Sequence, residues 1–378
     1  VEKARVKAET GCDTFFSQGS LPAALRAVGA VCNAVDRVVS GHNRNAFCIV
    51  RPPGHHAGVS GLLQDAISCG FCIFNNVAIA AMHSLRTYPT KVKRVAIVDF
   101  DVHHGNGTEE IIRTKFNNPS AFFFFSVHLF DKPPTGGEFY PGSGGSDDAA
   151  CNIVNAPLTP LWRVAANKTR SRSRGARSGG ADGANGPHAG RIGTRGASRA
   201  QAAADVEGSD NGDSGGAPST APSRDNGEDA AGSASSTTAN QDSVAGSDTA
   251  PTYGRAAFRA NITDRLLPAL HEFNPDLIFI SAGFDAGKND IGCSKTENGK
   301  YSSGIDLLPE DYNWATKRIQ AAADACCHGR VVSALEGGYG TWARVKDVKS
   351  GSGNARKLVL NRDQLAENAL AHVKALVN

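Results

Sequence analysis

Short apolar segments alternate with amphipathic segments along most of the chain. The apolar segments predict buried strands over residues 46–50, 95–101, 121–127, 276–281 and 330–335. Between them, apolar positions with helical spacing predict helices over residues 21–39, 75–85, 108–116, 258–273, 309–326 and 363–377. Strands that are apolar throughout and separated by helices are typical of an α/β domain, in which helices cover both faces of a mostly parallel sheet.

One long segment breaks this pattern. Residues 163–252 contain no Phe, Tyr or Trp and consist mainly of Gly, Ala, Ser, Asp, Asn and Arg. Such a composition cannot bury enough apolar surface to offset the entropy lost on ordering. We therefore expect a disordered insert that divides one folded domain into a first part, residues 1–162, and a second part, residues 253–378. The basic first half of the insert is either a localisation or anionic-partner tract, or a solvated linker attracted to the acidic second half.

The overall composition argues against several classes of protein. A formal net charge of +3 over 378 residues gives no case for binding nucleic acid or a membrane surface, and no apolar run is long enough to span a bilayer. Nine irregularly spaced cysteines indicate reduced thiols in the cytosol or nucleus, and the pair Cys69 and Cys72 is interpreted as core thiols. Because the chain starts at Val1 and its single methionine is Met82, we expect an N-terminal part to be missing.

Polar and glycine-rich segments follow each of the predicted strands. They read RPPGHHA, DVHHGNG, HLFD, AGFDAG and EGGYG. The carboxyl ends of parallel strands meet at one edge of an open α/β sheet, and ligands bind at that edge. We therefore expect these segments to build a single site.

The strand over residues 95–101 ends in side chains that can bind a metal ion. Asp99, Asp101 and His103 are spaced two residues apart, so they share one face of the strand. Asp285 lies just past another predicted strand and can supply a further carboxylate. Two carboxylates and an imidazole that leave one position open form the catalytic type of zinc site. Taken singly, each aspartate also fits a turn or a helix cap.

Two histidines and a tyrosine suggest acid–base chemistry beside this metal. His55 and His56 follow a Pro-Pro-Gly turn. As further ligands they would close the metal site, whereas beside a water they would act as acid and base. Asp99 and Asn106 are the polar side chains available to orient them. Tyr339 follows two glycines and either packs at a turn or donates a hydrogen bond to an oxygen that gains charge.

Seven segments, in this order, resemble the zinc-dependent histone deacetylases, closest to class II. They read RPPGHHA, GFCIFNNVAIAA, VAIVDFDVHHGNGT, FYPGSG, SAGFDAG, DLLPEDYNWAT and VVSALEGGYG. The likeness extends from Thr10 to Asn378 outside the insert. It implies the arginase–deacetylase fold, a single three-layer α/β domain around a mostly parallel sheet of eight strands. It also implies zinc-dependent hydrolysis of the acetyl amide of N6-acetyl-lysine in histones or other proteins, and thereby a part in regulating chromatin and transcription.

The resemblance implies the roles of the metal ligands and of the histidine pair. Asp101, His103 and Asp285 look like the zinc ligands. His56 looks like the general base that later acts as the acid, and His55 like its electrostatic or proton-donating partner.

Three more residues take catalytic roles from the resemblance. Asp99 matches the partner of His55, and Asn106 stands where class I members have Asp. Tyr339 matches the transition-state tyrosine, and a Tyr there favours activity because nearly inactive class II members have His.

The resemblance also implies substrate-binding and potassium-binding residues. The substrate-binding positions are Asp13, Gly70, Phe71, Tyr140 and Gly338. Among them, Phe71 and Tyr140 match the walls of the acyl-lysine tunnel, where Phe is commoner than Tyr at the second position, and Asp13 matches a rim aspartate that holds the substrate backbone. A structural potassium ion would be bound by Asp99, Ser126 and Val127 together with the carbonyl groups of Asp101 and His103.

The sequence departs from the family pattern in two places, and other functions remain as alternatives. The family's initial strand and helices are absent, and the loop after Asp285 reads Asn289–Gly292 in place of G-D-P-L-G, so we expect a differently shaped rim. The alternatives are an acetylpolyamine amidohydrolase, a two-manganese arginase-type enzyme, and a catalytically impaired binding or scaffold module. The expected partners are acetylated proteins and corepressor-type proteins, in the nucleus or the cytoplasm.

Overall fold

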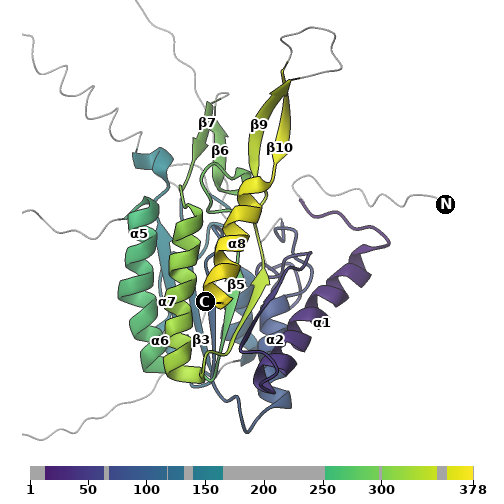
Figure 1. Ribbon diagram of the computed structural model, residues 1–378, viewed down its shortest axis with the longest axis vertical. Helices are drawn as coiled ribbons and strands as arrows, with labels where there is room; N and C mark the ends of the chain where they lie inside the picture. The colour runs from purple at the N-terminus through teal and green to yellow at the C-terminus, as the bar shows by residue number, and fades with distance from the viewer. Residues whose placement is uncertain are drawn as a thin grey trace, which may run out of the picture. The chain divides into compact units, whose positions relative to one another are not determined.

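A parallel six-stranded sheet forms the centre of the computed structural model (Figure 1). The structure describes residues 13–63, 68–116, 118–131, 139–164, 252–297, 300–346 and 356–377. The strands of the sheet are β1 (Asn45–Cys48), β2 (Val95–Asp99), β3 (Phe122–Leu129), β4 (Ile153–Leu158), β5 (Leu277–Ala282) and β8 (Val331–Leu335). Their spatial order is β1-β8-β5-β2-β3-β4, and every neighbouring pair is parallel.

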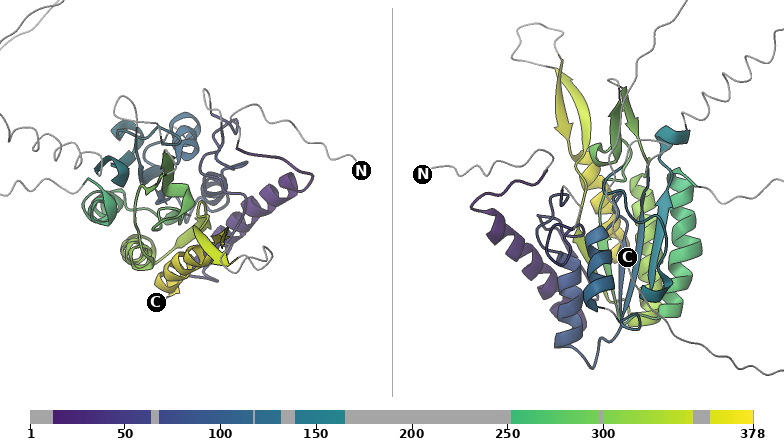
Figure 2. Two further views of the ribbon diagram at one scale, coloured as in Figure 1. Left: turned by 90° about the horizontal axis from the view of Figure 1, so that it is seen from above. Right: turned by 180° about the vertical axis from the view of Figure 1, so that it is seen from behind.

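Helices cover both faces of this sheet (Figures 1 and 2). One face carries α1 (Ser20–Val39), α2 (Asn76–Thr87) and α3 (Asn106–Ile111), which continues as the π-helix η1 (Ile112–Phe116). The other face carries α5 (Gly254–Asn261), the π-helix η3 (Ile262–Leu266), α6 (Leu267–Phe273), α7 (Pro309–Cys327) and α8 (Asp363–Val377). The three layers are therefore helices, sheet and helices.

Alternation along β2 shows why the sheet is buried on both sides. Val95 and Ile97 belong to the core cluster beneath α1 and α2, whereas Ala96 and Val98 belong to the cluster beneath α5 and α7. Successive strand residues point to opposite faces, so a strand covered on both sides is apolar throughout. Burial on both faces therefore explains the continuous apolar strands from which the α/β class was predicted. The structure confirms this class.

Some elements differ from the prediction. The described residues contain six strands of the central sheet, against the eight that were expected. One of the six, β4, was not predicted, because Asn155 and Pro157 interrupt its apolar pattern. Among the described strands, β3 is the single neighbour of β4 in the central sheet, and proline is tolerated in such an edge strand.

Two antiparallel hairpins also went unpredicted. The first pairs β6 (Ser294–Glu297) with β7 (Lys300–Ser303). The second pairs β9 (Thr341–Lys346) with β10 (Arg356–Asn361), directly after the EGGYG segment. Both extend beyond the carboxyl ends of the sheet strands (Figure 1).

The ends of the predicted insert lie side by side on the folded part. The Thr159 N–H donates to the Thr252 carbonyl at 2.9 Å, and Arg163 forms an ion pair with Asp131 at 2.8 Å. The first residues assigned to the insert are therefore part of the described fold. Residues 165–251 lie outside the described residues, as do residues 1–12, so the disorder of the insert and the domain boundaries stay predictions.

The register of the strands aligns the carboxyl ends of β2, β3, β5 and β8, from which the polar segments start. Asp99 is paired with Ser126 of β3 and with Ser281 of β5, and Ser281 is paired in turn with Ala334 of β8. The loops that follow these strands therefore start at the same edge. Among the described residues, none of the helices has the length and hydrophobicity needed to cross a lipid bilayer.

Candidate active site

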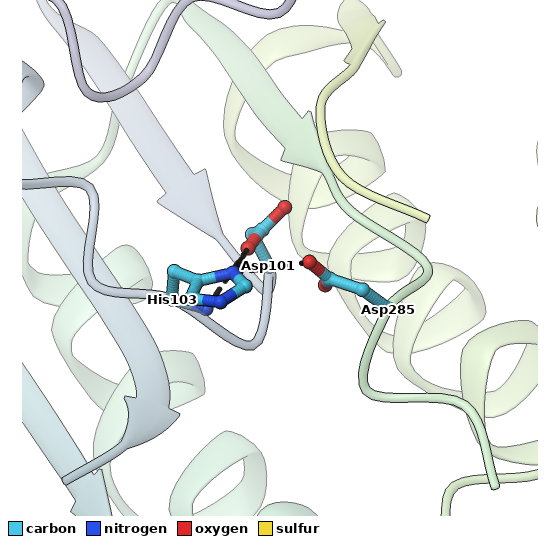
Figure 3. Close-up of side chains that lie close together, drawn as sticks. All are labelled: Asp101, His103 and Asp285. Atoms are coloured by element: carbon cyan, nitrogen blue, oxygen red, sulfur yellow. Dashed lines mark hydrogen bonds and ion pairs between the residues drawn. The ribbon is translucent and has the colours of Figure 1, made fainter. Parts of the chain in front are cut away.

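Asp101, His103 and Asp285 converge just past the ends of β2 and β5 (Figure 3). Their ligand atoms all lie within 4.8 Å of one another. The His103 Nδ1 atom faces Asp101 Oδ1 at 3.0 Å and Asp285 Oδ2 at 3.1 Å. Both carboxylates are fully buried, and the imidazole is mostly buried.

This geometry leaves a buried carboxylate oxygen without a donor. Asp285 Oδ1 accepts a hydrogen bond from the Val102 N–H at 3.0 Å, but Asp285 Oδ2 accepts none. Burial and the charge of Asp101 raise the pKa of Asp285. A buried charge is costly unless it is paired or binds a metal, so the cluster favours positive charge at the point where the two carboxylates meet. The donor set of two carboxylates and one imidazole fits a zinc ion.

Glycine backbones pack directly against the two carboxylates. The Gly337 N–H donates to Asp101 Oδ2 at 2.7 Å. A Cβ on Gly337 would lie 2.2 Å from Asp285 Oδ2, and a Cβ on Gly283 would lie 2.0 Å from Asp101 Oδ2. The glycines of the EGGYG and SAGFDAG segments therefore leave the space that the carboxylates occupy.

His55 is held by Asp99, as the resemblance implied. The His55 Nδ1 atom lies 2.8 Å from Asp99 Oδ2, and both side chains are buried. Burial by itself lowers the pKa of His55, but the charges of Asp99 and Asp101 outweigh it and raise the pKa to about 10. His55 is therefore a cation at neutral pH.

His56 has the opposite electrostatic environment. Its Nδ1 atom lies 2.8 Å from the neutral Asn106 Oδ1 atom. Burial, followed by the charges of His55 and His103, lowers the pKa of His56 well below its ordinary value. Because an amide oxygen only accepts, His56 Nδ1 carries the hydrogen and Nε2 is left with a free lone pair.

Tyr339 is positioned by an acid that the sequence analysis did not single out. Asp290 Oδ2 accepts hydrogen bonds from the backbone N–H groups of Tyr339 at 3.0 Å and Gly340 at 2.7 Å. Burial, followed by the charges of Asp285 and Asp101, raises the pKa of the Tyr339 phenol well above its ordinary value. The phenol is therefore protonated at neutral pH and can donate a hydrogen bond.

Glu336 is a second missed residue, at the start of the EGGYG segment. Its Oε2 atom accepts from the backbone N–H groups of Gly54 at 2.7 Å and His55 at 3.2 Å. Arg51 donates to the Glu336 carbonyl and lies 6.0 Å from the centre of the Tyr339 ring. The sequence signal for Glu336 was an acid directly after an apolar strand. Its positioning role could not be read from that signal, because its partners lie about 280 positions away in the sequence.

The expected substrate-binding residues surround this cluster. The rings of Phe71 and Tyr339 lie 5.9 Å apart, and those of Tyr140 and His56 lie 4.9 Å apart. Gly70 packs against His56, because a Cβ on Gly70 would lie 2.3 Å from the imidazole.

The remaining positions expected to bind the substrate lie at the margin of the site. Asp13 accepts a hydrogen bond from Thr14 at 2.9 Å, and Thr14 accepts one from the Phe71 N–H at 3.0 Å. Gly338 has a φ of +125° and packs against Leu365. Whether these positions bind a substrate stays a prediction.

The residues expected to bind potassium are buried beneath the site. Asp99 and Ser126 are paired across β2 and β3, and the Ser126 hydroxyl lies 2.9 Å from His128 Nδ1. Val127 follows in the same buried strand. Potassium binding at this place stays a prediction.

The second histidine of the DVHHGNG segment has a structural position. His104 Nδ1 lies 2.8 Å from the Ser143 hydroxyl, and Nε2 lies 2.9 Å from Glu109 Oε2. It therefore ties α3 to the loop that follows Tyr140, away from the metal cluster.

Comparison with known proteins identifies the family that this geometry belongs to. The profile described as "Histone deacetylase domain" matches residues 1–186 and 187–350. The chain belongs to the histone deacetylase family. Among its relatives, "Type-2 histone deacetylase 2" of Dictyostelium discoideum is 33% identical over 336 residues, which cover 87% of this chain and 13% of that protein. "Histone deacetylase 6" of Caenorhabditis elegans is 31% identical over 337 residues, which cover 86% of this chain and 22% of the relative.

A solved structure of this family shares the fold. The crystal structure of the HDA15 HD domain superposes with a TM-score of 0.55 at 24% identity, covering 96% of this chain and 64% of that one. The histone deacetylase relatives are much longer than this chain, which spans about an eighth of the first of them. The resemblance inferred from seven segments is confirmed at the level of the family.

Proposed function

We propose that this chain hydrolyses the acetyl amide of N6-acetyl-lysine in histones or other proteins and releases acetate. The observation that carries the proposal is the convergence of three kinds of group at one edge of the sheet. These are a buried Asp-His-Asp cluster, a histidine pair with opposed electrostatics, and a protonated tyrosine. Family membership supports the same reaction.

Asp101, His103 and Asp285 would hold a zinc ion. When bound, zinc polarises the amide carbonyl and lowers the pKa of the attacking water. Asp285 Oδ2 accepts no hydrogen bond and faces His103 Nδ1 at 3.1 Å, which supports this assignment because a cation between the two would satisfy the carboxylate. A bound potassium ion beneath the site remains part of the proposal.

His56 would remove a proton from the attacking water. Its free Nε2 atom can accept that proton, because Asn106 keeps the hydrogen on Nδ1. Protonated His55 beside it, with ring centroids 4.0 Å apart, keeps His56 neutral before the attack. His56 would then return the proton to the lysine amine as it leaves.

Tyr339 would stabilise the oxygen that gains negative charge during attack. Its phenol is protonated and is positioned by Asp290. A preorganised donor of this kind contributes roughly 10²- to 10³-fold to the rate.

The test is the release of acetate from an acetyl-lysine peptide by the purified chain loaded with zinc. Asp101→Asn and Tyr339→Phe variants serve as controls, and we expect activity to fall at least about 100-fold in each. The proposal fails if the zinc-loaded chain is folded but releases no more acetate than Asp101→Asn does.

An acetylpolyamine amidohydrolase is the alternative on the same fold. Such an enzyme needs an acid at the rim that is free to bind a cationic substrate. The acid beside Gly292 in the described part of the chain is Asp290. Its carboxylate is buried and accepts hydrogen bonds from three backbone N–H groups, so it is not free to bind a substrate. This favours acetyl-lysine, and comparing turnover of acetylspermidine with that of the peptide decides between them.

A binding or scaffold module is the other alternative. The complete set of acid, base and donor groups favours catalysis over this role. Corepressor-type partners and a nuclear or cytoplasmic location stay part of the proposal. A Tyr339→Phe variant with the same effect in cells as the unaltered chain would favour the scaffold.

A further inference from the structure

The β9–β10 hairpin follows the candidate active site directly in the sequence. β9 begins at Thr341, two residues after Tyr339. Its base is anchored, because the Ile291 N–H donates to the Gly340 carbonyl at 2.9 Å and a Cβ on Gly340 would lie 2.2 Å from the Asn361 carbonyl oxygen. A ligand that touches the hairpin therefore acts on the segment that positions the catalytic phenol.

One face of the hairpin carries large apolar side chains that are exposed. The register pairs Trp342 with Leu360 and Arg344 with Leu358, so these four side chains share a face. Trp342 is 55% exposed and Leu358 is 56% exposed. A two-stranded hairpin is only marginally stable in water, and contiguous exposed apolar side chains mark interaction sites.

The same face carries an unpaired positive charge. Arg344 is exposed and forms no ion pair with any residue in the described part of the chain. Exposed Lys357 adds a further charge on the opposite face of the hairpin. The surface thus offers an aromatic ring and an aliphatic side chain beside a cation, which is complementary to an apolar residue next to an acid.

Distance along the strand sets which part of a substrate can reach this surface. A strand advances about 3.3 Å per residue, so Trp342 and Arg344 lie roughly 10 and 16 Å along the chain from Tyr339. An extended peptide advances at the same rate. Residues about three to five positions from an acetyl-lysine at the site are therefore far enough along an extended peptide to reach the hairpin.

We infer that the β9–β10 hairpin binds the segment flanking the acetyl-lysine and selects substrates with an apolar and an acidic residue in that flank. The inference rests on the proposed deacetylase function. Among the substrates proposed above, it favours proteins with such a flank over the Lys- and Arg-rich tails of histones, whose charge Arg344 and Lys357 would repel.

The experiment uses the full zinc-loaded chain and three substrates. Two are peptides of equal length with Leu-Glu-Glu or Leu-Lys-Lys beside the acetyl-lysine, and the third is an acetyl-lysine amide without flanks. We expect kcat/KM to be higher for the acidic flank than for the basic one. Arg344→Glu should lower the ratio of kcat/KM for the acidic-flank peptide to that for the flank-free substrate roughly two- to fivefold. Trp342→Ala should lower the corresponding ratio for both peptides.

Two readouts separate this inference from the proposed function. Lys93→Glu is the matched control, because Lys93 is exposed in the turn before β2, at the opposite edge of the sheet. Turnover of all three substrates at equal kcat/KM would overturn the inference and leave the deacetylase proposal standing.

Fluorescence anisotropy of the labelled peptides is measured in parallel. If no substrate is turned over, equal binding of both peptides to the unaltered chain and to Arg344→Glu would overturn the inference as well.

Discussion

Asp290 holds the backbone of Tyr339 through a carboxylate oxygen, which accepts the Tyr339 N–H at 3.0 Å. The same carboxylate also accepts from Gly292 and Gly340. The loop after β5, which carries a metal-site carboxylate, is thereby joined to the loop after β8, which carries the phenol. Together with the hydrogen bond from the Ile291 N–H to the Gly340 carbonyl at 2.9 Å, this acid fixes the position of the phenol relative to Asp285.

Replacing Asp290 should uncouple Tyr339 from the metal site. In Asp290→Ala three backbone N–H groups lose their acceptor, and each buried loss costs about 1–3 kcal/mol. We expect kcat to fall more than tenfold, with a smaller change in KM. Asp290→Asn, which keeps one acceptor oxygen, should recover part of the activity. Steady-state kinetics check this, and an unchanged kcat in a folded Asp290→Ala variant would contradict it.

Asn106 should control the pH dependence of the general base. In Asn106→Asp a carboxylate would face His56 Nδ1 at the present 2.8 Å contact and favour the imidazolium. The acid limb of the kcat/KM profile should then move to higher pH by about one unit. Asn118→Asp, in an exposed turn before β3, is the control and should leave the profile unchanged. Coincident profiles for the two variants would argue against His56 as the base.

Gly337 should be required for metal binding. A Cβ at this position would lie 2.2 Å from Asp285 Oδ2 and 2.5 Å from Asp101 Oδ2, so at least one carboxylate must move. We expect Gly337→Ala to bind zinc at least about tenfold more weakly. Zinc content measured by elemental analysis checks this against Gly29→Ala, where the added Cβ meets no atom within 4 Å. One zinc per chain in both variants, with equal resistance to a chelator, would refute the prediction.

His372 should make the fold less stable in acid. It lies between the Thr316 and Ser333 hydroxyls, at 2.7 and 3.0 Å, and burial lowers its pKa to about 3. The unfolded chain takes up this proton near pH 6.5 and the folded chain does not, so stability falls as the pH drops from about 6.5 towards 3. This histidine should account for about 2 kcal/mol between pH 7 and pH 5.

Urea unfolding of the unaltered chain and of His372→Gln at both pH values isolates this contribution. The variant loses packing and hydrogen bonds at either pH, so only the difference between the two pH values is compared. An equal pH-dependent loss in both proteins would show that His372 is not responsible.

The sequence by itself determined the α/β class, the strands β1, β2, β3, β5 and β8, and which polar side chains meet at one edge of the sheet. The strands could be predicted because burial on both faces makes them apolar throughout, which is a local property. Asp101, His103 and Asp285 could be predicted because they follow such strands, and the ends of parallel strands meet at one edge. The Asp99 contact with His55 followed from the resemblance, whereas Asn106 was predicted only as an available acceptor and the structure assigned it to His56.

Only the tertiary structure decided the remaining features. The edge strand β4 contains Asn155 and Pro157, so its pattern is not that of a buried strand. The positioning roles of Asp290 and Glu336 depend on backbone groups that only strand register brings near them. The β9–β10 hairpin was missed because its pairing joins strands separated by residues 347–355 and leaves large apolar side chains exposed. Long-range pairing has no local signal in the sequence, whereas burial and strand-end chemistry do.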